Sequence, residues 1–168
     1  MKKLHIFIAS LLAMSSVWTT AQTVHTIGDS TMADYNESTT DQRGWGQMFP
    51  GFLTPDIHVD NRALNGRSTR SFRNEGHWEL VRKKLRKGDY VFIQFGHNDQ
   101  KADTARHSDA ETDYKINLGK YIDETRKVGA IPVLFTPIVR RKFNPNGTLA
   151  DTHGKYTDAV RTVAKEKQ

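Results

Sequence analysis

Apolar positions along the chain follow two different spacings. Four apolar runs of strand length alternate with stretches in which apolar residues have helical spacing. Strands that alternate with helices are typical of βαβ crossovers around a parallel sheet. The predicted strands cover residues 24–27, 57–61, 90–95 and 131–136.

The third predicted strand, 90–95, is the most apolar of the four, which indicates a central strand covered on both faces. Helical spacing predicts short helices over 45–52 and 78–85 and a longer one over 109–128 that stops at Gly129. A last amphipathic helix is marked by Tyr156, Ala159, Val160 and Val163, and residues 136–154 form a long loop rich in Pro, Asn, Gly and Arg.

The first 21 residues have the pattern of a secretory signal peptide. Lys2 and Lys3 precede an apolar stretch, and small residues end at Ala21 before Gln22. The apolar stretch is shorter than the roughly 20 residues that span a bilayer, although an N-terminal membrane anchor is the alternative. We therefore expect a secreted or periplasmic protein without stable membrane insertion, with one domain over 22–168.

Charge and cysteine content narrow the function classes. Removing residues 1–21 takes away two of the 25 Lys and Arg and none of the 19 Asp and Glu, so the formal charge falls from +6 to +4. A mildly basic surface can attract an acidic polysaccharide. Nucleic-acid binding is not expected, because the basic residues do not form a stripe with interleaved aromatic residues. The absence of cysteine excludes a disulfide framework and a thiolate nucleophile. No metal-ligand spacing such as H-E-x-x-H occurs, so we expect neither metal nor cofactor.

The loop after the first predicted strand contains Gly28-Asp29-Ser30. Ligands of open parallel sheets bind outside the carboxyl ends of the strands. A serine at a strand-to-helix turn there exposes its Oγ and places its own N–H at the start of a helix, which suits a nucleophile whose reaction develops an oxyanion. Taken alone, Gly-Asp-Ser is also a common turn or N-cap sequence.

Two further loops supply candidate oxyanion donors. Gly66, after the second strand, can offer its backbone N–H, as a glycine of an ordinary turn also can. Asn98, in Gly96-His97-Asn98-Asp99 after the third strand, can donate from its side-chain amide or stabilise an Asx turn. A nucleophile and two donors thus follow three successive strands in order.

These motifs resemble the SGNH (GDSL-type) hydrolases. Gly28-Asp29-Ser30 is similar to the nucleophile block, Gly66 to the glycine block and Gly96-His97-Asn98-Asp99 to the G-x-N-D block of that superfamily. The longer strings from Gly28 to Ala33, Gly44 to Gln47 and Gly66 to Phe72 resemble its rhamnogalacturonan acetylesterase branch. The resemblance implies a three-layer α/β/α sandwich on a five-stranded parallel sheet, no cofactor, Ser30 as nucleophile, and an oxyanion hole formed by the Ser30 N–H, the Gly66 N–H and Asn98.

The fourth block of the family, D-x-x-H, has no match in the chain. No Asp is followed by a His three residues later, and Asp151-Thr152-His153 has the wrong spacing and lies in the long loop. We therefore expect the triad Asp and His, with a fifth strand and a last helix, to lie beyond Gln168, and the chain alone to be inactive, because a serine without a base is a weak nucleophile.

Four other histidines are candidates for the general base. His25, His58 and His77 are expected to be packing or surface residues, whereas His97 neighbours Asn98 and is the alternative general base.

The favoured function is a secreted serine esterase that removes O-acetyl groups from plant cell-wall polysaccharide, with pectic rhamnogalacturonan as the expected substrate and a monomer as the expected state. Acetylxylan or lipid acyl esters are alternative substrates within the superfamily. A binding protein that has lost its base is the alternative of another class.

Overall fold

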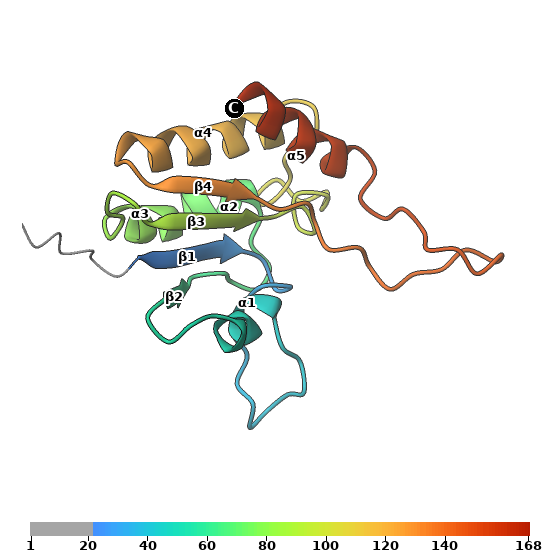
Figure 1. Ribbon diagram of the computed structural model, residues 1–168. Coiled ribbons are helices and arrows are strands. Elements are labelled where there is room, and N and C mark those ends of the chain that lie inside the picture. The colour runs from blue at the N-terminus through green and yellow to red at the C-terminus, as the bar shows by residue number, and fades with distance from the viewer. Residues whose placement is uncertain (1–21) are drawn as a thin grey trace, which may run out of the picture.

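The computed structural model describes residues 22–168, so the predicted signal peptide lies outside the described residues. Four parallel strands form one sheet in the order β2-β1-β3-β4 (Figure 1). They are β1 (Thr23–Gly28), β2 (His58–Asn61), β3 (Tyr90–Gln94) and β4 (Ile131–Leu134). All four predicted strands are confirmed to within two residues at each end, and β3 is an inner strand, as expected.

Alternate side chains of β3 face two different layers, as the two-residue period of a strand requires. Val91 and Ile93 are fully buried in an apolar core that the helices α2 to α5 complete. On the opposite face the Phe92 ring lies 5.6 Å from Phe49 and 5.1 Å from Phe135, centroid to centroid. The sheet therefore separates two helical layers, and the predicted α/β/α fold class is confirmed.

All four predicted helical stretches are helical in the structure, although their ends differ and one further helix is present among residues 22–168. They are α1 (Trp45–Met48), the 3-10 helix η1 (Phe49–Phe52), α2 (Thr69–Asn74), α3 (His77–Arg82), α4 (Asp113–Lys127) and α5 (Lys155–Glu166). The single helix predicted over 45–52 splits into α1 and η1, because Pro50 has no N–H to continue the α-helical ladder. The longer helix starts at Asp113 rather than at 109, because the Asp109 carboxylate accepts the N–H groups of Glu111 and Thr112 in a preceding turn.

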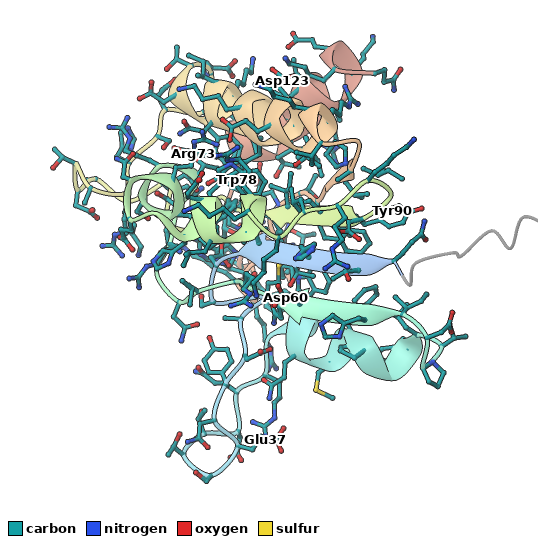
Figure 2. All side chains as sticks on the ribbon, turned by 90° about the vertical axis from the view of Figure 1, so that its left-hand side faces the viewer. Glu37, Asp60, Arg73, Trp78, Tyr90 and Asp123 are labelled. Carbon is teal, nitrogen blue, oxygen red and sulfur yellow. The ribbon has the colours of Figure 1, made fainter. Side chains whose placement is uncertain are left out.

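The sequence analysis missed α2. Its N-cap is Ser68, whose hydroxyl accepts the Ser71 N–H while the Ser71 hydroxyl accepts the Ser68 N–H, a capping box with Ser in place of the usual Glu. From α2 and α3, Arg73 and Trp78 both extend to the Glu124 carboxylate on α4 (Figure 2). These bonds attach the short helices to the long one across the core.

A long loop joins β4 to α5 and extends away from the body of the molecule (Figure 1). It matches the predicted loop over 136–154 and contains one antiparallel bridge, Phe143 to Leu149. Among residues 22–168, no helix has the length and apolar character needed to cross a membrane.

The aromatic core beneath the site can be tested by mutation. Phe95 is fully buried against Phe72 and Tyr121, whereas Phe52 is 83% exposed. We predict that Phe95→Ala lowers the free energy of unfolding by about 3–5 kcal/mol, because it removes a buried ring and leaves a cavity. The control Phe52→Ala should change it by less than about 0.5 kcal/mol. Urea denaturation of both variants checks this, and equal losses would contradict the assigned core.

Candidate active site

Ser30 lies at the carboxyl end of β1, in a tight turn that Asp29 organises. The buried Asp29 carboxylate accepts the N–H and the hydroxyl of Thr31, at 2.9 and 2.8 Å, and the Asp29 carbonyl accepts the N–H of Ala33. The expected helix after Ser30 is absent: the chain makes only this turn, and the next helix is α1. The Ser30 N–H has no acceptor among residues 22–168, and the Tyr35 hydroxyl fixes the Ser30 carbonyl at 2.9 Å.

Gly66 lies in the loop that follows β2. Its φ is +77°, in the left-handed region that glycine adopts without strain. The Leu64 N–H donates to the Gly28 carbonyl at 3.0 Å, which ties this loop to the end of β1. Within the described part of the chain the Gly66 N–H has no acceptor, and space around the α-carbon is open. The N–H is therefore available to a ligand.

Asn98 follows β3 and is 7% exposed. Its Nδ2 donates one hydrogen bond to the Arg67 carbonyl at 3.0 Å, so the side chain reaches across to the Gly66 loop. A side-chain amide carries two N–H donors, and the other has no partner among residues 22–168. This contact fixes the rotamer of the amide and leaves one donor free.

The structure brings these three residues to one edge of the sheet. β1 lies between β2 and β3, and all three strands run in the same direction. Hydrogen bonds join the loop after β2 to the end of β1 and to the loop after β3. A hydroxyl nucleophile with unpaired N–H donors beside it can attack a carbonyl carbon and stabilise the resulting oxyanion.

The buried side chain of Gln94 anchors the loop that contains Ser30. Gln94 Oε1 accepts the Trp45 indole N–H at 2.7 Å and the Thr31 hydroxyl at 3.2 Å, and its Nε2 donates to the Thr136 carbonyl at 3.1 Å. One side chain of β3 thus joins the loops after β1 and β4 and the first helix.

His97, the alternative general base, is engaged with the long loop. Its Nε2 donates to the Ile138 carbonyl at 2.7 Å, and His153 Nε2 donates to the same carbonyl at 2.8 Å. The two rings stack with centroids 4.5 Å apart. Burial lowers the pKa of both imidazoles, which keeps this shared contact uncharged at neutral pH. In this arrangement the His97 Nε2 is not available to take a proton from Ser30.

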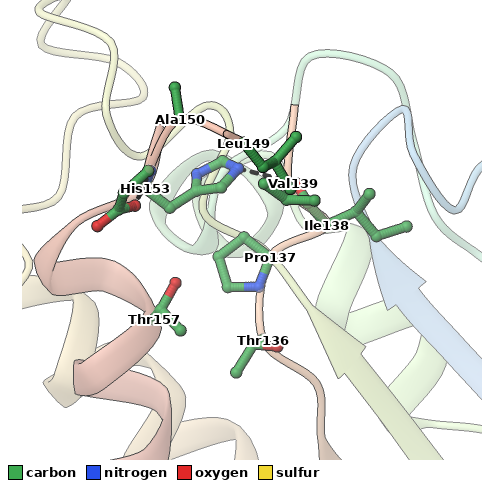
Figure 3. Close-up of a pocket in the computed structure, with 9 residues that line it drawn as sticks. Thr136, Pro137, Ile138, Val139, Leu149, Ala150, His153 and Thr157 are labelled. Atoms are coloured by element: carbon green, nitrogen blue, oxygen red, sulfur yellow. Dashed lines mark hydrogen bonds between the residues drawn. The ribbon is translucent and has the colours of Figure 1, made fainter. Parts of the chain in front are cut away.

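His153 lines an open pocket of about 600 Å³ between the long loop and α5 (Figure 3). Pro137, Ile138, Leu149 and Thr157 are among its lining residues. Asp151 also lines it, but Asp151 Oδ1 accepts the backbone N–H groups of His153 and Gly154 and makes no bond to the imidazole. Asp151 and His153 therefore stabilise the long loop and do not form a hydrogen-bonded Asp–His pair.

Of the other three candidate bases, His25 and His77 pair with carboxylates and His58 is exposed. His25 is buried in β1 with Nδ1 3.2 Å from Asp60 and Nε2 3.6 Å from Asp89, and burial lowers its pKa. His58 is exposed, and His77 pairs with Glu75 at 3.0 Å.

Comparison with known proteins agrees with this geometry. The model of the GDSL-like Lipase/Acylhydrolase family matches residues 26–168. The chain belongs to this family. The resemblance drawn from Gly28-Asp29-Ser30, Gly66 and Gly96-His97-Asn98-Asp99 is thereby confirmed at the level of the family.

Two relatives from Bacillus subtilis (strain 168) are both named rhamnogalacturonan acetylesterases, the second as a probable one. The chain is 39% identical over 139 residues to rhamnogalacturonan acetylesterase RhgT, covering 83% of the chain and 59% of the relative. It is 36% identical over 148 residues to the probable rhamnogalacturonan acetylesterase YesY, covering 88% and 67%. The chain thus spans about three fifths to two thirds of the length of these relatives.

Solved structures show the same fold. The crystal structure of the protein YxiM from Bacillus subtilis superposes with a TM-score of 0.77 at 31% identity, over 88% of this chain and 42% of that one. An acetyl xylan esterase, AlAXEase, superposes with a TM-score of 0.59 at 17% identity, over 86% and 73%, and this likeness shows the fold alone.

The sequence analysis named Asp99 as the last residue of Gly96-His97-Asn98-Asp99 but gave it no role of its own. Asp99 is fully buried behind Asn98, with Oδ1 accepting the Thr69 N–H at 3.0 Å and the Thr69 hydroxyl. Its Oδ2 is buried without a hydrogen-bond partner in the described residues. Burial raises the pKa of Asp99 to about 7, against the opposing effect of the Thr69 bonds. Its signal in the sequence was its place as the last residue of the Gly96-His97-Asn98-Asp99 motif.

The raised pKa of Asp99 makes a prediction about stability. A carboxyl whose pKa is higher in the folded than in the unfolded protein contributes stability below about pH 4 that is lost as the pH rises through 7. We predict that Asp99→Asn removes this loss. Between pH 4 and pH 8 the free energy of unfolding of Asp99→Asn, measured relative to that of the parent at the same pH, should therefore rise by up to about 4 kcal/mol.

Urea denaturation at several pH values between 4 and 8 checks this prediction. Asp103→Asn is the matched control: Asp103 is exposed, pairs with Arg106, and has a pKa below its usual range. Its variant should show a small difference of opposite sign. Parallel pH profiles of the parent and Asp99→Asn would contradict the assigned environment of Asp99.

Proposed function

We propose that this protein is a serine esterase that removes O-acetyl groups from an acidic plant cell-wall polysaccharide, with rhamnogalacturonan as its substrate. The observation that supports the proposal is that Ser30, Gly66 and Asn98 follow three parallel strands that end at one edge of the sheet. Among residues 22–168 the Gly66 N–H has no acceptor and the Asn98 amide uses one of its two N–H donors. The names of RhgT and YesY, at 39% and 36% identity, support the acetyl ester and the polymer. A formal charge of +4 after removal of residues 1–21 favours a polymer that contains uronate.

In the proposed reaction the Ser30 Oγ attacks the acetyl carbonyl carbon, and the sugar oxygen leaves with a proton. The carbonyl oxygen becomes an oxyanion and accepts hydrogen bonds from the Ser30 N–H, the Gly66 N–H and the free Asn98 N–H. Water then releases acetate from Ser30. The general base is not assigned to any residue of this chain, since His97 is bound to Ile138 and no D-x-x-H is present.

Acetate release from acetylated rhamnogalacturonan by the purified full-length protein tests this function. We predict that Ser30→Ala lowers the rate at least about 1000-fold and that Asn98→Ala lowers kcat about 100-fold, because each removes a group that acts in the transition state. The control Ser38→Ala changes an exposed turn serine and should leave the rate unchanged. Undiminished release by the Ser30 variant would contradict the mechanism, and a preference for long-chain acyl esters would contradict the substrate.

We also propose that the protein is exported as a monomer after removal of residues 1–21. The charged start, short apolar stretch and small residues before Gln22 support cleavage there. N-terminal sequencing of the exported protein should begin at Gln22. A mature protein that begins at Met1 would contradict the proposal.

A further inference from the structure

Two loops of the candidate site are joined beneath the surface by a carboxyl group. Asp99 Oδ1 accepts two bonds from Thr69, and Thr69 is the first residue of α2, three positions after Gly66. Asp99 directly follows Asn98 in the other loop. One buried side chain therefore connects the segment with the Gly66 N–H to the segment with the Asn98 amide.

Both ends of this connection are held by the helices behind them. The Thr69 carbonyl accepts the Tyr121 hydroxyl at 2.9 Å, and the Thr69 hydroxyl oxygen accepts Asn117 Nδ2 at 3.2 Å, both from α4. The Asp99 carbonyl accepts the Tyr156 hydroxyl of α5 at 3.2 Å. The connection is thus part of the rigid core and not a contact between two free loops.

A second bond crosses the same pair of loops nearer the surface, from Asn98 Nδ2 to the Arg67 carbonyl. With the Thr69 bonds it fixes the two loops at two points, Arg67 and Thr69, one and three positions after Gly66. We propose that Asp99 is a positioning residue that sets the separation of the two oxyanion donors, the Gly66 N–H and the Asn98 amide, through its bonds to Thr69. The inference rests on the proposed function for its catalytic meaning.

The protonation state of Asp99 sets the strength of its hydrogen bonds to Thr69. An ionised carboxylate accepts hydrogen bonds more strongly than a neutral acid does, so ionisation tightens the bonds to Thr69. The titratable groups packed around it are Tyr114 and Tyr121 of α4 and Tyr156 of α5, and burial raises the pKa of all three hydroxyls. These tyrosines stay neutral across the range in which Asp99 titrates.

Nuclear magnetic resonance tests the connection without reference to activity. In the parent protein the Gly66 amide and the Asn98 side-chain amide should both shift with a common midpoint at about pH 7, that of Asp99. Both transitions should vanish in Asp99→Asn. The His97 transition lies lower, because burial lowers its pKa, so the two are separable. A Gly66 amide that does not follow the titration of Asp99 would overturn the proposal.

Kinetics on an acetyl ester test the catalytic consequence. We expect Asp99→Asn to lower kcat about 10- to 100-fold with KM within twofold, because displaced donors lose contact with the oxyanion and not with the bound ester. Thr69→Val removes one of the two donors to Asp99 and should lower kcat severalfold, and Thr69→Ser should restore it. Equal kcat in the parent and Thr69→Val would overturn the proposal.

The two proposals fail in different ways. A parent protein that releases no acetate contradicts the proposed function, while the amide titration still decides whether Asp99 moves Gly66 and Asn98. If the parent protein is active but the Gly66 amide shift does not follow the titration of Asp99, only the positioning role is contradicted. If Asp99→Asn does not fold, the Thr69→Val variant supplies the test. The midpoint of the Asp99 titration should then be higher than in the parent, because the ionised carboxylate loses a hydrogen-bond donor. An unchanged midpoint would contradict the proposed connection between Asp99 and Thr69.

Discussion

The parallel pairing of β1 with β2 on one side and with β3 on the other decides where every candidate site residue lies. The register sets Thr26 opposite Asn61 and Gly28 opposite Gln94, so the three following loops leave the sheet side by side. A slip by one residue would turn Val91 and Ile93 out of the core, which makes the register costly to change. The apolar core that fixes the register therefore also fixes the separation of the loops.

Polar side chains complete what apolar packing begins. Asp29, Gln94, Asn98 and Asp99 are each at most 7% exposed, and all lie at the carboxyl edge of the sheet. Each makes hydrogen bonds to a neighbouring loop or within its own turn, which offsets much of the cost of burial. Hydrogen bonds depend on direction as well as distance, so they hold the loops in one arrangement more strictly than apolar contacts would.

The sequence predicted the sheet and the order of the three site blocks because both are local patterns. Near-continuous apolar runs mark strands such as Tyr90–Gln94, and parallel topology then places the loops that follow them at one edge. The short helix α2 was missed because its six residues have no apolar period, and its stability comes from the Ser68 cap and from contacts with α4. Short helices depend on tertiary packing, which a local pattern does not contain.

Site residues that act through distant partners escaped prediction for the same reason. Asp99 and Thr69 are 30 positions apart, and His97 and His153 are 56 apart, so neither pair has a signature along the chain. His153 was assigned to loop structure on its spacing from Asp151, and it does lie in the loop, but it is 4% exposed and stacked on the site loop. Only the fold brings these residues together.

The unpaired donors of the site are compatible with a stable fold because they lie near the surface. The Ser30 and Gly66 residues are half-buried, so water can hydrate their N–H groups in the free protein, and the penalty of a buried unpaired donor does not arise. In the proposed reaction, an oxyanion that replaces this water would meet donors already oriented by the turn at Asp29, the left-handed backbone of Gly66 and the Asn98 bond to Arg67. Little reorganisation remains at the moment of reaction, and this is the condition under which hydrogen-bond donors lower a barrier most.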